Sequence, residues 1–162
     1  MSDNPTEVTR AEVTEWFFQD YLQRWVAVAA GTSGEGPEFI LDYWGTPLHV
    51  TALGQSFWCL DDAGVLAFLE MNQAPLREAG YSHTVVPDRR VFVYNAVGAA
   101  IEVIWSRRRA DESEIERWAV QFSVAKSDKG WRVVGIHSAA TDKDRLADIW
   151  PVEAVMEEAN HG

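Results

Sequence analysis

The sequence has 162 residues, a formal net charge of −11 and 47% hydrophobic residues. This length suits one domain with a sizeable core, and the composition is that of a globular protein rather than a disordered or fibrous one. The acidic excess argues against binding to nucleic acid or to an anionic membrane, because phosphate groups would be repelled.

Cysteine and histidine usage limits the redox and metal chemistry of the chain. Cys59 is the single cysteine, so neither an intrachain disulfide nor a thiolate metal cluster can form. His49 and His137 with a carboxylate are a conceivable three-ligand set, but no two candidate ligands share helical or strand spacing. We therefore expect neither a metal nor a cofactor. With a polar beginning and no long apolar run, we expect a cytoplasmic protein without a membrane span.

Residues 6–30 have the pattern of an amphipathic helix. Glu12 follows Thr9 at capping-box spacing, and a glycine-rich loop over residues 31–37 ends the segment. The apolar positions that fall on one helical face are Val13, Phe17, Tyr21, Trp25 and Val28.

The rest of the chain changes from helical to strand periodicity. A strand-like run over 48–53 precedes a second helix over 63–79, in which Pro75 predicts a kink or a break. Four strands then follow at short intervals, over residues 84–95, 98–108, 114–127 and 130–140. Short connections predict an antiparallel meander. We expect a single domain over 1–140 and a C-terminal helical tail over 141–162, with a short helix around 143–150.

This order of elements resembles the nuclear transport factor 2-like superfamily, which includes SnoaL-like polyketide cyclases and ketosteroid isomerases. The resemblance covers roughly residues 6–140 and rests on four features of the sequence. These are the aromatic-rich first helix, the turn over 43–47, the helix over 65–79 and the closing run over 130–138, which begins Gly-Trp and ends His-Ser. It implies an α+β fold, in which N-terminal helices close a cone-shaped, curved antiparallel sheet (a cystatin-like roll).

The resemblance also implies where catalytic groups would lie. Ketosteroid isomerases use a Tyr of the first helix, an Asp that precedes a Pro in the following turn, and a second acid on an inner strand. Tyr21 matches the first of these, but Thr46 precedes Pro47, and the strand offers Ala119 or Gln121. The Asp-Arg-Asp set of limonene-epoxide hydrolases also has no match on an inner strand. The familiar isomerase and hydrolase chemistries are therefore not predicted.

Strand parity predicts a pocket inside the cone. In the last two strands, Trp131, Val133 and His137 share one parity, which we expect to face inward. The residues expected to bind a ligand are Phe17, Trp25, His49, Trp118, Val120 and Phe122.

Two residues of this pocket are candidates for catalysis. Tyr21 would donate a hydrogen bond to a ligand oxygen, and His137 would act as a general base. The alternatives are a tyrosine whose hydroxyl meets a neighbouring helix and a histidine that only satisfies a structural partner. The parity of His49 is not fixed by the sequence.

We expect two further groups of residues at the surface. The basic run over residues 107–109, which acids follow at once, is interpreted as the solvated end of a hairpin. The outer face of the sheet is expected to form a homodimer through a group of apolar residues. These are Ala100, Ile104, Ala119, Val134 and Ile136.

Two functions remain open from the sequence. The first is an acid–base enzyme (an isomerase, cyclase, dehydratase or hydrolase) that acts on a small apolar molecule. Its support is a pocket that holds Tyr21 and His137. The second is a non-catalytic module that binds a hydrophobic ligand or mediates dimeric protein interaction. Its support is the missing carboxylate base.

Overall fold

The computed structural model describes residues 4–153. One long helix is built from α1 (Pro5–Thr14), a π-helical segment (Glu15–Tyr21) and α2 (Leu22–Ala30), and the other long helix is α3 (Asp62–Glu78). The strands are β1 (Trp44–Ala52), β2 (Gln55–Cys59), β3 (Tyr81–Val85), β4 (Arg89–Asn95), β5 (Gly98–Arg109), β6 (Glu114–Ser127) and β7 (Gly130–Ala140). Short 3₁₀ turns lie at Pro37–Asp42 and Leu146–Asp148.

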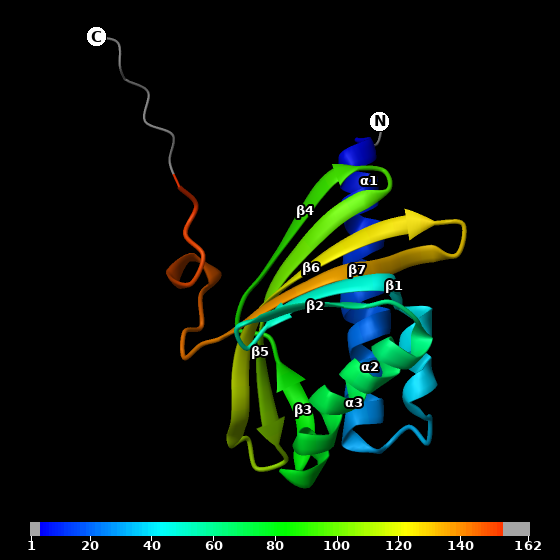
Figure 1. The fold of residues 1–162 in the computed structure, drawn as a ribbon. Coiled ribbons are helices and arrows are strands. Elements are labelled where there is room, and N and C mark those ends of the chain that lie inside the picture. The colour runs from blue at the N-terminus through cyan, green and yellow to red at the C-terminus, as the bar shows by residue number, and fades with distance from the viewer. Residues whose placement is uncertain (1–3, 154–162) are drawn as a thin grey trace.

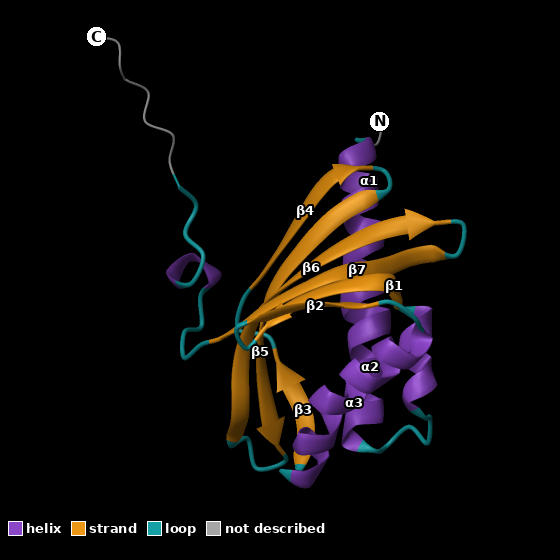
Figure 2. Cartoon of the chain, in the orientation of Figure 1, coloured by secondary structure: helices purple, strands orange, loops and turns teal. Residues whose placement is uncertain are grey.

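The strands form one curved sheet with the order β2-β1-β7-β6-β5-β3, and β4 also pairs with β5. All pairs are antiparallel except β1 with β7. The long helix crosses the concave face, and α3 packs beside α2 (Figures 1 and 2). The predicted α+β fold, a curved sheet covered by N-terminal helices, is confirmed. Within residues 4–153, no helix is both long and apolar enough to cross a membrane.

The first helix presents an apolar face that runs through its π-helical segment. Asn4 caps the helix by accepting a hydrogen bond from the Thr6 N–H at 2.9 Å. Phe17 and Tyr21 lie in this segment, and both are buried on the side of the helix that faces the sheet and the cavity. The predicted inner face of this helix is therefore correct.

Several predicted boundaries need correction. The segment over 84–95 is two strands rather than one, because Pro87 and Asp88 interrupt the pairing with β5. Pro75 does not divide α3, which runs on to Glu78. The strand β2 was not predicted. The helix expected around 143–150 is only a 3₁₀ turn, and the last part of the predicted tail, 154–162, lies outside the described residues.

The C-terminal segment covers part of the outer face of the sheet (Figure 1, orange). Leu146 is fully buried there against Ile104 and Ala119. Its backbone N–H donates to Asp88 Oδ2 at 2.8 Å, which ties the segment to the loop before β4. The chain thus shields its own outer apolar surface.

This covering changes the surface on which the homodimer prediction rested. Ile104 and Ala119 are fully buried beneath Leu146, and Ile136 faces the concave side. Of the five apolar residues, Val134 is the one with substantial exposure, at 38%. The expected contact patch is therefore wrong, whereas self-association itself stays a prediction.

We expect Leu146→Ala to lower the free energy of unfolding by about 2–4 kcal/mol, because it opens a cavity over Ile104 and Ala119. Urea denaturation followed by circular dichroism measures this loss. The matched control is Val152→Ala, since Val152 is 83% exposed and should change stability by less than about 0.5 kcal/mol. Equal effects of the two substitutions would contradict the packing described for this segment.

Candidate functional site

A cavity of about 470 Å³ lies between the concave face of the sheet, the long helix and α3. Its volume is in the range that holds small organic ligands. Tyr21, Leu22, Trp25, Trp44, Ala52, Leu53, Gln55, Phe57, Phe68, Met71, Asn72, Pro75, Trp105, Arg107, Glu116, Trp118, Val120, Phe122, Ile136 and Ser138 line it. Four of these are tryptophans, so the walls are largely aromatic with a few polar groups.

The part of the cavity wall that the sheet supplies includes residue pairs of β5 and β6 that lie directly opposite each other. Trp105 pairs with Trp118, and the next row towards the hairpin pairs Arg107 with Glu116. Directly opposite residues on one face of a sheet have adjacent side chains. The apolar wall therefore ends in a charged row, which β5 and β6 provide.

Tyr21 lies at the centre of the cavity wall. Its side chain is 3% exposed, and its ring packs 4.9 Å from that of Phe17. Burial raises the pKa of Tyr21 well above its ordinary value near 10, although the nearby Trp44 indole N–H and the charge of Arg107 act in the opposite direction. At neutral pH the phenol is therefore uncharged and able to donate a hydrogen bond.

Trp44 offers a second donor to the same cavity. Its side chain is buried, and its N–H lies close enough to the Tyr21 hydroxyl to lower the pKa of that phenol. Even so, Nε1 makes no hydrogen bond of normal geometry within residues 4–153. An unpaired buried donor costs about 1–3 kcal/mol, so an acceptor that comes within hydrogen-bond distance of Nε1 would recover this energy. Nearby, the Asn72 amide donates from Nδ2 to the Phe68 carbonyl oxygen at 2.8 Å, which leaves Oδ1 as an acceptor.

Arg107 and Glu116 form the charged row. Arg107 Nε lies 3.3 Å from Glu116 Oε2, and its Nη1 donates to Thr84 Oγ1 at 3.2 Å. The Arg107 Cζ atom lies 4.1 Å from the centre of the Trp25 ring, in cation–π geometry. Burial lowers the pKa of Arg107, while Tyr81 and Glu116 act in the opposite direction. Because the ordinary pKa of an arginine lies far above neutral pH, Arg107 stays charged despite this lowering.

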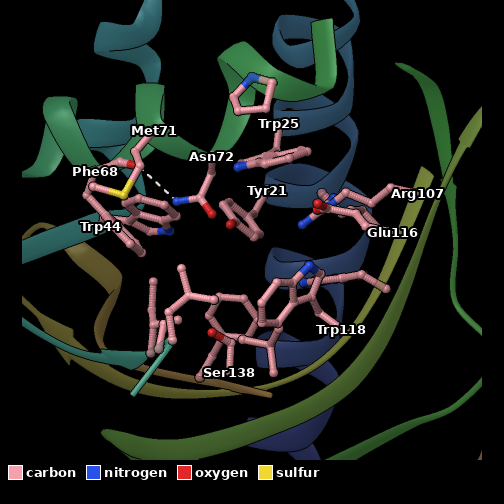
Figure 3. A pocket seen from close by; sticks show the side chains of 18 of the residues that line it. Tyr21, Trp25, Trp44, Phe68, Met71, Asn72, Arg107, Glu116, Trp118 and Ser138 are labelled. Atoms are coloured by element: carbon pink, nitrogen blue, oxygen red, sulfur yellow. Dashed lines mark hydrogen bonds and ion pairs between the residues drawn. The ribbon is translucent and has the colours of Figure 1, made fainter. Parts of the chain in front are cut away.

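The polar groups lie at two ends of the cavity. Figure 3 shows Trp44 and Asn72 on one side of Tyr21, and Arg107 and Glu116 on the other. Tyr21 lies between the two ends, and both Trp44 and Arg107 act to lower its pKa. The arrangement suits a ligand with an apolar body and polar atoms near one or both ends.

Five of the predicted site residues line this cavity, namely Tyr21, Trp25, Trp118, Val120 and Phe122. Phe17 does not line it. Instead, its fully buried ring packs between helix and sheet, 4.9 Å from the Phe122 ring. It therefore belongs to the core next to the cavity rather than to the ligand surface.

His49 and His137 lie away from the cavity. His137 Nδ1 is 2.5 Å from Thr51 Oγ1, and the two imidazole rings are 5.7 Å apart. His49 Nε2 lies 2.9 Å from Ser56 Oγ, and its ring stacks on Trp58. Partial burial, with the neighbouring His49, lowers the pKa of His137. The expectation that these histidines face the pocket is therefore wrong.

A β-bulge in β7 explains the error in parity. Val133 pairs with Val124 and Gly135 pairs with Ser123, so Val134 is an extra residue on β7. One added residue moves every following side chain to the other face of the sheet. Ile136 therefore faces the cavity, and His137 faces outward.

Sequence reasoning missed Arg107 because it lies in the basic run that was interpreted as a solvated hairpin end. It also assigned no role to Glu116, which shares the parity of Trp118 on the predicted strand over 114–127. Counting in twos from Val103 through Trp105 would have placed Arg107 on the inner face. Trp44 and Asn72 were also missed, since their position depends on how α3 and β1 approach each other and no local pattern shows this.

A family model described as NTF2-like protein (DUF6841) matches residues 11–141. The chain belongs to this family. No curated protein matches the sequence.

Solved structures show the same NTF2-like fold at low sequence identity. An NTF2-like protein with a cystatin-like fold from Novosphingobium aromaticivorans is 16% identical, with a TM-score of 0.58 over 88% of this chain and 92% of that chain. An NTF2-like superfamily protein from Salmonella enterica is 16% identical, with a TM-score of 0.56 over 96% and 99%. A protein of unknown function from the DUF3225 family of Pectobacterium atrosepticum is 15% identical, with a TM-score of 0.58 over 83% and 92%. At these identities the likeness describes the fold alone.

The raised pKa of Tyr21 predicts a pH dependence of stability. Below pH 10 the phenol is protonated in both states and contributes nothing to it. Above pH 10 the unfolded chain releases the proton while the folded one retains it, so this group lowers the free energy of unfolding by about 1.4 kcal/mol per pH unit. Denaturant titrations at pH 9 and 11 should show a smaller alkaline loss for Tyr21→Phe than for the unsubstituted protein. Exposed Tyr94 supplies the control Tyr94→Phe, and the same loss in all three proteins would contradict the prediction.

Proposed function

We propose that this protein binds a small, mostly apolar molecule that presents a hydrogen-bond acceptor, such as a ketone oxygen, in the cavity. The observation that carries the proposal is a pair of buried donors at an aromatic wall. These are the neutral Tyr21 hydroxyl and the unpartnered Trp44 indole N–H.

Apolar contacts and hydrogen bonds contribute differently to the recognition of the ligand. Burial of apolar ligand surface stabilises the complex by about 25 cal/mol per Å² before the cost of association, and does so for any molecule of fitting shape. The donors select among such molecules. A ligand without an acceptor leaves Tyr21 and Trp44 unpaired, at a cost of about 1–3 kcal/mol, or roughly 5- to 150-fold in affinity.

The test compares two ligands of nearly the same shape. 2-Acetylnaphthalene carries a ketone oxygen, and 2-isopropenylnaphthalene replaces that oxygen with a CH₂ group. We expect the ketone to bind at least about fivefold more tightly, because only its oxygen can accept from Tyr21 and Trp44. Ligand-observed NMR titration measures both dissociation constants. Equal affinities, or no binding of either compound, would reject the proposal.

A substitution of Tyr21 then tests whether the preference for the ketone arises in the cavity. Tyr21→Phe should weaken the ketone by roughly 5- to 10-fold and leave the alkene within about twofold, because it removes one hydroxyl and keeps the ring. Tyr94→Phe is the matched control, since Tyr94 is 68% exposed and does not line the cavity. An unchanged ketone preference in Tyr21→Phe would remove Tyr21 from the site.

The second candidate is acid–base catalysis, which the carboxylate of Glu116 favours because it lines the same cavity as Tyr21. The pairing of Glu116 with Arg107 weighs against this role, since a nearby guanidinium makes a carboxylate a weaker base. The two candidates differ in a measurable step. A base in the cavity would accelerate exchange of the methyl protons of 2-acetylnaphthalene in D₂O, and Glu116→Gln would abolish that acceleration. Binding alone leaves the exchange rate at the buffer value.

A further inference from the structure

Arg107 is held in the cavity wall by three neighbouring groups. Thr84 on β3, Arg107 on β5 and Glu116 on β6 form one cross-strand row, so the guanidinium has a partner on either side. Trp25 covers its plane at 4.1 Å from the α2 side. A guanidinium fixed in this way is preorganised, because its own side chain loses little further freedom when a ligand binds.

The two members of the ion pair differ in exposure. The side chain of Arg107 is 11% exposed, whereas that of Glu116 is 37% exposed. Rotation of Glu116 towards water would return its carboxylate to solvent at small cost, as for other exposed partners. Arg107 is held by Thr84 and Trp25, so it would stay in the cavity wall as a desolvated cation without a counterion. The carboxylate of a ligand can therefore replace the carboxylate of Glu116 beside Arg107.

We infer that Arg107 forms an anion subsite of the cavity, at which a ligand carboxylate takes the place of Glu116. The inference rests on the proposed function and narrows its ligand class to monocarboxylic acids with an aromatic or alicyclic body. The exchange keeps the number of charges next to Arg107 unchanged, and a planar carboxylate can accept two N–H bonds from a guanidinium. The aromatic walls formed by Trp105 and Trp118 would enclose the rest of the ligand.

The acidic surface of the protein acts against an anionic ligand only at long range. The net charge of −11 is spread over the whole chain, and charges more than about 8 Å apart are largely screened at physiological salt. The short contact with Arg107 is within this distance and is sheltered from water. Net charge therefore slows the approach of the ligand more than it weakens the bound state.

The experiment uses an isosteric pair, 2-naphthoate and the neutral 2-acetylnaphthalene, with calorimetric titration of each. Glu116→Gln should tighten 2-naphthoate by about 10-fold or more, because the ligand no longer displaces a carboxylate, and should change the ketone by less than about twofold. Glu112→Gln is the matched control, since it removes one negative charge from the exposed hairpin loop outside the cavity. This control should change neither affinity by more than about twofold.

Arg107→Met completes the design by removing the cation while it retains an apolar stem. It should weaken 2-naphthoate by about 10-fold or more and keep the ketone within about twofold, provided that circular dichroism shows a folded protein. Should this variant fail to fold, the Glu116→Gln comparison decides alone. An unchanged affinity of Glu116→Gln for 2-naphthoate would overturn the anion subsite.

The two proposals fail separately. If the ketone binds with its expected dependence on Tyr21 but 2-naphthoate shows no dependence on Glu116, the anion subsite is wrong and the proposed function stands. If 2-naphthoate behaves as expected and the ketone does not bind, the donor pair of Tyr21 and Trp44 is wrong. If neither compound binds the unsubstituted protein, both proposals are rejected.

Discussion

The packing of Phe17 between the first helix and the sheet determines where the cavity can be. Its ring is fully buried, 4.9 Å from Phe122 and 6.1 Å from Trp105, and it fixes the helix against the concave face. Loss of such a ring typically costs about 3–5 kcal/mol. Beyond this contact the sheet curves away from the helix, so Tyr21 and Trp25, on the next two turns, face the cavity rather than the sheet.

The features that could be predicted from the sequence are those set by local periodicity. The inner face of the first helix follows from spacings of three and four, and the bounds of β6 and β7 follow from alternation and from the turn that joins them. Side-chain direction after Val134 could not be predicted in this way. The bulge is a mismatch between the pairing of two strands. Its trace in the β7 sequence is slight, a change in the parity of the apolar residues from Trp131 and Val133 to Ile136.

The charged row was missed for a different reason. Charged residues next to a hairpin are usually solvated, and this expectation outweighed the parity that places Arg107 on the inner face. That general expectation does not take into account the neighbouring groups that stabilise a buried Arg107 in this fold. Thr84, Glu116 and the ring of Trp25 all reach the guanidinium from elements that are distant in sequence. A buried charge is retained where such partners converge, and tertiary structure alone brings them together.

The two polar ends of the cavity are compatible because burial keeps Tyr21 uncharged between them. Burial, the dominant influence, keeps its phenol protonated, and the positive charge of Arg107 favours ionisation. Loss of Glu116 without replacement would leave Arg107 uncompensated and strengthen that second influence. A ligand carboxylate at Arg107 offsets this positive charge, and burial keeps Tyr21 a neutral donor while the anion subsite is filled. A ligand that carries an acid at one end and a carbonyl at the other can therefore engage both ends at once.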